Sequence, residues 1–358
     1  MRRVVLPKLR IGDLLASVPI IQGGMGVGIS LSGLSSAVAN QGGIGVIAVA
    51  GIGMSEADSL KNYVEANIRA LRQEIQKARK LTKGILGVNI MVALSNFSEM
   101  VTVAIEEGID IIFAGAGLPL NLPSLLNGSV KTKLVPIISS ARAANLITRR
   151  WFERYNYKPD AFVVEGPKAG GHLGFKPDQL TDPAYQLEKL IPEVVQEVTD
   201  LEKVVESKIP VIAAGGVYTG EDIRKYLSMG ASGVQMATRF VATDECDASD
   251  VFKQAYIQSE KEDIVIIKSP VGLPGRAIRN TFINDVEAGE KKPFACPYHC
   301  IITCDFKKSP YCIAAALMQA KKGNLKHGFA FSGSNAYRIK NIVPVKKLMD
   351  ELREGYEH

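Results

Sequence analysis

Eight short apolar runs, rich in β-branched residues and separated by segments of helical pattern, constrain the fold of this 358-residue chain most strongly. Each run is continuously apolar rather than alternating, which is typical of a parallel strand buried on both faces. Most runs begin about 25 residues after the previous one, which leaves room for one crossover helix. Eight such units predict an α/β fold, a (β/α)8 TIM barrel rather than an open sheet. The runs are Pro19–Gln22, Ile44–Val49, Leu86–Met91, Asp110–Ala114, Leu134–Ser139, Ala161–Glu165, Pro210–Ala214 and Gly233–Met236.

Two connections are longer than the others and predict additional structure. Residues 55–83 carry apolar side chains at helical spacing and predict a long amphipathic helix. Residues 166–184 follow the sixth run, and a long loop at that place often covers an active site. We expect the barrel to span residues 1–265 and a C-terminal extension, residues 266–358, to pack on it. The extension predicts helices near Ile313–Lys322 and Val345–Glu354.

Composition and charge exclude several classes of protein. Hydrophobic residues make up 46% and charged residues 22%, so a wholly disordered chain is excluded. No run of apolar residues is long enough for a transmembrane helix, and the first residues lack a signal peptide, so we expect a cytoplasmic protein without membrane contact. The net charge of +6 is dispersed and no recognition motif accompanies it, which favours solvated helix faces over nucleic-acid binding. The expected partner is a small-molecule substrate, and the sequence is compatible with a homodimer.

The carboxyl ends of the strands are the expected ligand site, because ligands bind there in parallel barrels. Fifteen residues in and after the apolar runs are therefore candidates for binding a cofactor. They are Gln22, Gly23, Gly24, Met25, Asn89, Ser139, Glu165, Gly170, Gly171, Gly215, Gly216, Gln235, Met236, Ala237 and Thr238.

Glycines after the seventh run and polar residues after the eighth form a phosphate-site pattern. Gly215 and Gly216 would let backbone N–H groups approach a phosphate, and residues 235–238 would lie at the start of a helix. Tight turns also require glycine, but two such turns at these two strands favour a phosphate-bearing cofactor. The segment Gly23–Gly28 lacks the acidic residue of a dinucleotide fingerprint, so we interpret it as packing over a flat cofactor ring.

His172 is the candidate catalytic residue. It is the one histidine of four that lies in the predicted barrel, within the glycine-rich segment after the sixth run. An imidazole at that place can act as a general base near neutral pH, or it can cap a backbone carbonyl and be structural. Glu165 has a similar alternative, a carboxylate satisfied by neighbouring backbone N–H groups.

Four motifs together resemble the nitronate monooxygenase (2-nitropropane dioxygenase-like) family, which includes the flavin-dependent enoyl-acyl-carrier-protein reductases. The resemblance covers roughly residues 5–285, and a further segment at residues 274–280 is similar to the family as well. Lys168, Ala237 and Tyr218 depart from the residues common at these positions, which puts substrate choice in doubt more than flavin binding. The motifs are residues 21–26, 165–174 with Ala169-Gly170-Gly171-His172 at their centre, 213–217 and 233–240.

The resemblance implies a TIM barrel that binds FMN non-covalently, with His172 as the catalytic histidine. The implied activity is oxidation of nitronates or nitroalkanes with O2. The alternative is an NAD(P)H-dependent enoyl-thioester (enoyl-acyl-carrier-protein) reductase, in which NAD(P)H reduces the flavin. Two further hypotheses are a flavin-binding electron carrier without small-molecule turnover and a phosphate-sugar isomerase on the same fold.

Four of the five cysteines lie within one short stretch: Cys296, Cys300, Cys304 and Cys312. Four thiolates in a short segment are the ligand set of a [4Fe–4S] cluster, whereas zinc sites favour more tightly paired cysteines. The third alternative is a reduced, partly helical tail without metal. We interpret residues 329–335 as a turn that packs against the barrel rather than one that binds a ligand.

Overall fold

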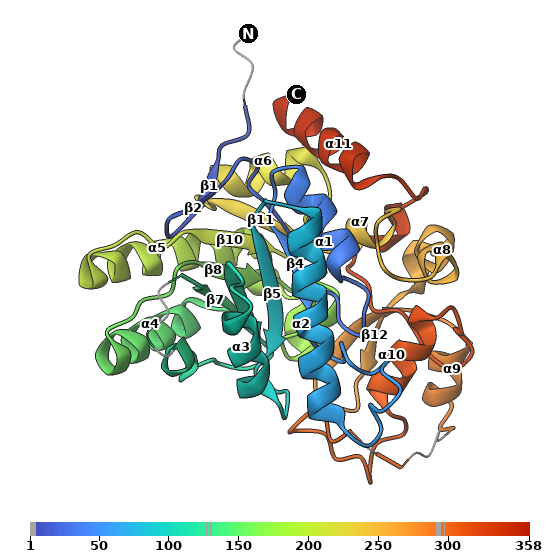
Figure 1. Cartoon of the computed structure of the whole chain (residues 1–358). Coiled ribbons are helices and arrows are strands. Elements are labelled where there is room, and N and C mark those ends of the chain that lie inside the picture. Colours follow the sequence, from blue (N-terminus) through green and yellow to red (C-terminus); the bar gives the residue numbers. More distant parts are fainter. Residues whose placement is uncertain (1–4, 127, 129–130, 291–294, 297) are drawn as a thin grey trace.

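The computed structural model describes residues 5–126, 128, 131–290, 295–296 and 298–358, and its centre is a parallel barrel (Figure 1). The strand order is β3-β11-β10-β8-β7-β6-β5-β4. A parallel bridge between Ile21 and Ile44 joins the first and last strands, and the Gln22 N–H donates to the Ile44 carbonyl at 2.9 Å. The predicted TIM barrel is therefore confirmed. Its strands are β3 (Ile20–Gln22), β4 (Gly45–Ala48), β5 (Leu86–Met91), β6 (Ile111–Gly115), β7 (Lys133–Ile138), β8 (Phe162–Glu165), β10 (Val211–Ala214) and β11 (Gly233–Met236).

A β-hairpin near the N-terminus packs into the interior of the barrel. Strands β1 (Leu9–Ile11) and β2 (Leu14–Ala16) pair antiparallel. Leu9, Ile11 and Ala16 belong to the same buried cluster as inward-facing barrel residues such as Val46 and Phe113. The hairpin therefore seals one end of the barrel, and the carboxyl ends of the strands remain for a ligand.

Helices surround the barrel and pack on the outer faces of the strands (Figure 1). The long insertion contains turns and then α2, which buries Leu71, Ile75 and Ala78. Between β6 and β7 the connection is the short 3-10 helix η1 instead of a regular crossover helix. The helices of this part are α1 (Ser32–Asn40), α2 (Tyr63–Leu81), α3 (Phe97–Glu106), η1 (Leu122–Leu126), α4 (Ala141–Tyr155), α5 (Leu187–Val205), α6 (Gly220–Ser228), α7 (Thr238–Val241) and α8 (Asp250–Gln258).

The last helix, α11 (Val345–Glu357), packs on both α6 and α1 (Figure 1). It buries Leu348, Met349 and Leu352 in the main core of the protein. The gap between α6 and α1, where the helix after the eighth strand lies in a regular barrel, is thus filled from the far end of the chain.

Described parts of the segment between α8 and α11 lie over the carboxyl ends of the strands and join the loop after β8 in a separate three-stranded sheet. Strands β12 (Ile264–Lys268) and β13 (Pro274–Ile278) are antiparallel, and β13 also pairs with β9 (Gly171–His172). The loop predicted over residues 166–184 therefore contains a strand that is held from outside the barrel. The remaining elements are η2 (Pro177–Leu180), η3 (Pro183–Tyr185), η4 (Lys261–Asp263), α9 (Thr281–Glu287), α10 (Ile313–Lys321) and η5 (Ala336–Arg338).

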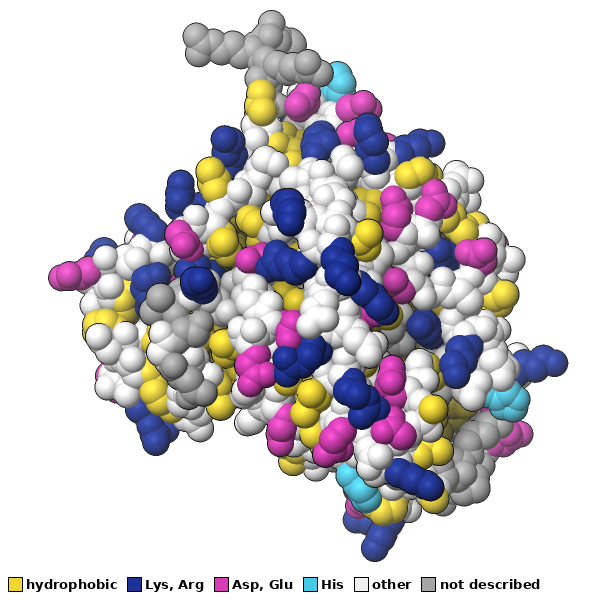
Figure 2. Space-filling view, in the orientation of Figure 1, with side chains coloured by type: hydrophobic (Ala, Val, Ile, Leu, Met, Phe, Trp, Pro, Cys, Tyr) yellow, Lys and Arg dark blue, Asp and Glu magenta, His cyan; other side chains and the backbone are white. Residues whose placement is uncertain are grey.

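The charge on the surface and the length of the helices bear on the two predictions about partners, that the protein contacts neither nucleic acid nor a membrane. On the face that Figure 2 shows, basic and acidic side chains are interspersed, and no continuous basic stripe is visible among the described residues. No helix in the described part of the chain is both long and apolar enough to cross a membrane.

Gly220 at the start of α6 provides a test of how α11 docks. A Cβ at this position would overlap the backbone nitrogen of Tyr356 and the carbonyl carbon of Gly355. We expect Gly220→Ala to lower the free energy of unfolding by about 2 to 3 kcal/mol, because the two helix backbones must move apart. Thermal unfolding should show a melting temperature several degrees lower. Ser228→Ala, at the exposed end of the same helix, serves as the control and should change stability by less than about 0.5 kcal/mol. Equal melting temperatures for both variants would contradict this packing.

Candidate active site

A cavity of about 320 Å³ lies at the carboxyl ends of the barrel strands. Residues in or after all eight strands line it. Residues from the C-terminal extension (residues 266–358, from here on the C-terminal segment) line it as well. Fourteen of the sixteen residues predicted from the barrel sequence lie on its wall: Gly23, Gly24, Met25, Asn89, Glu165, Gly170, Gly171, His172, Gly215, Gly216, Gln235, Met236, Ala237 and Thr238.

Two predicted residues, Gln22 and Ser139, do not line the cavity. The Gln22 side chain is fully buried in the barrel, where its Oε1 accepts from the Val46 N–H at 3.0 Å and its Nε2 donates to the Gly23 carbonyl at 2.6 Å. Ser139 donates its hydroxyl to the Gly174 carbonyl at 3.4 Å. Gln22 therefore joins β3 to β4 inside the barrel, and Ser139 joins the end of β7 to the loop after β8.

Glycines bring the backbone close to the cavity at two places. A side chain at Gly24 would overlap Asn89, so glycine is needed where the loop after β3 passes that residue. Gly215 and Gly216 have φ angles of 94° and 92°, which L side chains rarely adopt. The backbone after β10 can therefore turn tightly and present its peptide groups to a ligand.

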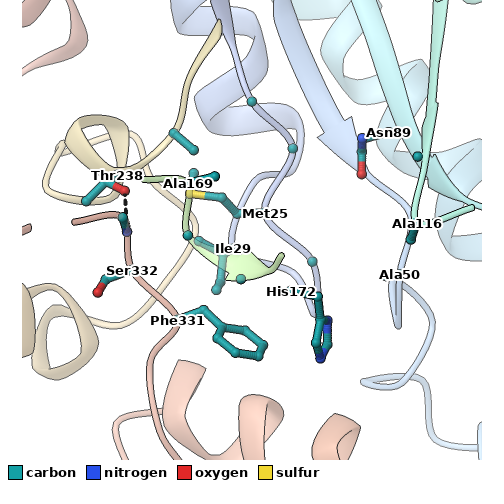
Figure 3. Close-up of a pocket in the computed structure, with 18 of the residues that line it drawn as sticks. Met25, Ile29, Ala50, Asn89, Ala116, Ala169, His172, Thr238, Phe331 and Ser332 are labelled. Carbon is teal, nitrogen blue, oxygen red and sulfur yellow. Dashed lines mark hydrogen bonds between the residues drawn. The ribbon is translucent and has the colours of Figure 1, made fainter. Parts of the chain in front are cut away.

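Residues 332–335 complete the end of the cavity near Thr238, where Figure 3 shows Thr238 and Ser332 close together. The Gly333 N–H donates to Thr238 Oγ1 at 2.9 Å, and Asn335 Nδ2 donates to the Gly216 carbonyl at 2.8 Å. The prediction that this stretch only packs against the barrel missed its place in the site. The run of small polar residues Ser332-Gly333-Ser334-Asn335 is the sequence signal from which a place in the site could have been predicted.

His172 lies on β9 and reaches the cavity beside Phe331, its ring edge-on to that phenyl ring with centroids 5.0 Å apart (Figure 3). Its Nε2 is 2.7 Å from the hydroxyl oxygen of Ser269, a residue of the C-terminal segment. The partner is thus a hydroxyl group and not the backbone carbonyl that a purely capping histidine would have. Burial lowers the pKa of His172 from 6.5 to about 4. The imidazole is therefore neutral at neutral pH, and one of its ring nitrogens is a hydrogen-bond acceptor.

Glu165 ends β8 and faces the same cavity. Its carboxyl group has no hydrogen-bond partner among the described residues, so the alternative of a carboxylate satisfied by backbone N–H groups does not hold there. Burial raises its pKa from 4.5 to about 7. Near neutral pH this carboxyl group can both donate and accept a hydrogen bond to a ligand.

Arg276 on β13 holds the loop that follows β8. Its side chain is buried, and Nη1 donates to the carbonyls of Pro167, at 2.7 Å, and Ala169. Burial lowers its pKa from 12.5 to about 10, so the guanidinium stays charged. Arg276 was not among the predicted site residues, although it belongs to the segment 274–280, which resembles the family.

The four clustered cysteines surround a second cavity of about 220 Å³, which adjoins the first. Cys300, Ile301, Ile313 and Ala314 line both cavities. All five cysteines are free thiols, and Cys246 is buried elsewhere in the main core. Among the residues that the structure describes, no three His, Cys, Asp or Glu side chains are arranged to share one metal ion.

Comparison with known proteins identifies the family. The family model for nitronate monooxygenase matches residues 9–355, and the chain belongs to this family. A probable nitronate monooxygenase of Staphylococcus aureus (strain Newman) is 31% identical over 76% of this chain and 78% of that protein. A (3aS,4S,5R,7aS)-5-hydroxy-7a-methyl-1-oxo-octahydro-1H-indene-4-carboxyl-CoA dehydrogenase of Mycobacterium tuberculosis is 29% identical over 76% of this chain and 66% of its own length.

Solved structures agree with this assignment. FabK from Thermotoga maritima, an enoyl-acyl-carrier-protein reductase, superposes with a TM-score of 0.73 at 28% identity, over 94% of this chain and 92% of that one. A nitroalkane oxidase from Streptomyces ansochromogenes has the same fold, with a TM-score of 0.70 at 21% identity over 95% and 96% of the two chains. The protein is therefore a TIM-barrel oxidoreductase of a family whose members depend on FMN.

The protonation of His172 can be measured directly by NMR on histidine-labelled protein. We expect its titration midpoint near pH 4, because burial disfavours the imidazolium ion. Between pH 6.5 and about pH 4, His172 is protonated in the unfolded chain but neutral in the folded protein. The free energy of unfolding therefore decreases as the pH falls through this range. The signal is assigned by its absence from a His172→Gln variant. A midpoint at or above 6.5 would show that the imidazole is not buried in this way.

Proposed function

We propose that this protein binds FMN non-covalently in the larger cavity and oxidises nitronates and nitroalkanes with O2. One observation carries the proposal: a half-buried imidazole, His172, which is neutral at neutral pH, faces a glycine-lined cavity at the carboxyl ends of the strands. The family and the staphylococcal relative support the same reaction.

The residues of the cavity fit FMN in three respects. Gly24 lies against Asn89 with no room for a side chain, and both residues line the cavity that the ring of the cofactor would occupy. The turn at Gly215 and Gly216, with Thr238 and Gly333 nearby, offers backbone and hydroxyl groups to the phosphate. Glu165 supplies an unpartnered carboxyl group for hydroxyl groups of the cofactor.

The protein's own residues then have separable roles. FMN, when bound, supplies the electron-transfer chemistry, and the protein orients the substrate against it. In the tautomer that carries the ring proton on Nε2, His172 donates to the Ser269 hydroxyl oxygen, and Nδ1 would then be free to remove the α-proton of a neutral nitroalkane. Phe331 holds the edge of the imidazole, and apolar side chains such as Met25 and Leu94 limit access of water to the cavity.

Reduction of an enoyl thioester by NAD(P)H is the second candidate function. The similarity to FabK over nearly the whole chain and to dehydrogenases of a CoA thioester favours it. NAD(P)H would reduce the flavin, and His172 would hydrogen-bond to the thioester carbonyl or supply a proton. Both reactions use the same cavity, so the electron donor distinguishes them.

Anaerobic reduction of the flavin separates the two functions. A nitronate is added to one sample of purified, FMN-loaded protein and NAD(P)H to another, and the flavin absorbance is followed. We expect nitronate to bleach the flavin and NAD(P)H to leave it oxidised, because only the first would be a substrate. Bleaching by NAD(P)H alone would contradict the monooxygenase proposal and direct the search to enoyl thioesters.

A His172→Ala variant tests the role of the imidazole in the same assay. We expect FMN to remain bound while turnover of a neutral nitroalkane falls by about 10² to 10⁴, the usual contribution of general base catalysis. His327→Ala, which changes an exposed histidine, serves as the control and should react like the unmodified protein. Turnover by the His172 variant at the unmodified rate would make His172 structural.

A further inference from the structure

The second cavity, next to the proposed flavin site, is surrounded by thiols. Its wall contains Cys296, Cys300, Cys304 and Cys312, and all four are free. The volume of about 220 Å³ is far more than one metal ion occupies. A small, partly open cavity with four thiol groups on its wall is a feature that nothing in the proposed oxidation of nitronates uses.

The segment that carries these cysteines is held in place by the barrel. Ile301 forms an antiparallel bridge with Leu94 in the loop after β5. The Ser95 N–H donates to the Cys300 carbonyl at 3.1 Å, and the Ile302 N–H donates to the Ala93 carbonyl at 2.9 Å. The position of Cys300 is thus fixed by backbone pairing and not only by the cluster itself.

We propose that Cys296, Cys300, Cys304 and Cys312 hold a [4Fe–4S] cluster in the second cavity. Four cysteine thiolates in a short segment are the usual ligand set of such a cluster. A tetrahedral zinc ion at about 2.3 Å from each sulfur would need the sulfurs to be within about 4 Å of one another. No such compact group is present among the described residues, whereas a cluster with its own iron and sulfide ions fills the space between more widely separated thiolates.

The surroundings of the cavity suit a buried cluster. The His299 N–H donates to the sulfur of Cys296 at 3.4 Å, and hydrogen bonds of this kind tune iron–sulfur clusters. Cys312 immediately precedes α10, so its sulfur lies at the positive end of a nine-residue helix. Phe306 and Ile313 give the cavity apolar walls, which limit access of solvent.

The shared wall relates the cluster to the larger cavity. Because Cys300 lines both cavities, the cluster would be a one-electron carrier directly beside the proposed FMN. This relation rests on the proposed function, but the cysteine site does not: iron and sulfide can bind whether or not FMN does. The two proposals can therefore fail separately.

Metal and flavin analysis of the same anaerobically purified full-length protein tests the proposal. We expect about four iron and four acid-labile sulfide ions per chain, and an electron paramagnetic resonance signal after reduction with dithionite. Cys300→Ala and Cys304→Ala should each lose at least half of the iron and sulfide, because each removes one ligand. Cys246→Ala removes the one cysteine outside the group and should keep the full content.

The flavin content separates loss of the cluster from loss of the fold. A cysteine variant that keeps FMN but loses iron and sulfide supports the proposal. Unmodified protein that binds FMN but no iron and sulfide, even after incubation with ferrous iron and sulfide, would overturn it. One zinc ion per chain without sulfide would overturn it as well. Iron and sulfide in a protein without FMN would leave the cluster proposal standing and contradict the proposed function.

Discussion

The candidate active site depends on the hydrogen bonds of one buried guanidinium, that of Arg276. It lies on β13, outside the barrel, and donates to the carbonyls of Pro167 and Ala169 in the loop after β8. No carboxylate forms a salt bridge with it in the described part of the chain, so carbonyl oxygens satisfy a charge that is costly to bury. The same strand pairs with β9 and so positions His172. One strand thus holds the loop after β8 through a cation and the strand that carries His172 through backbone pairing.

The site is consequently built from two parts of the chain that are far apart in sequence. The barrel supplies the glycine turns, Glu165 and the loop that carries His172. The C-terminal segment supplies Ser269 against the imidazole, Phe331 beside it, and Gly333 against Thr238. A barrel without this segment would keep the cavity floor but lose the groups that contact His172, and α11 fastens the far end of the segment to α6 and α1.

The sequence predicted the barrel and most of the cavity wall because both leave local patterns. Buried parallel strands such as β6 are continuously apolar, and the turn at Gly215 and Gly216 requires glycine wherever it occurs. Gln22 and Ser139 were predicted from their place after a strand, but whether such a side chain points into the cavity or behind it depends on the loop that follows. Arg276 was missed because its partners are more than 100 residues away, and no periodicity records such a pairing.

FMN affinity of an Arg276→Met variant is the measurement that tests most directly whether this clamp forms the site. Removing the guanidinium leaves two buried carbonyls unpaired, at a cost of about 1 to 3 kcal/mol, so we expect FMN to bind at least tenfold more weakly. Arg276→Lys should recover part of the affinity, and Arg279→Met, which breaks a half-exposed ion pair with Glu287 on the surface, should bind FMN normally. Unchanged FMN affinity in the Arg276→Met protein would contradict the claim that the C-terminal segment holds the loop after β8 in the form that binds FMN.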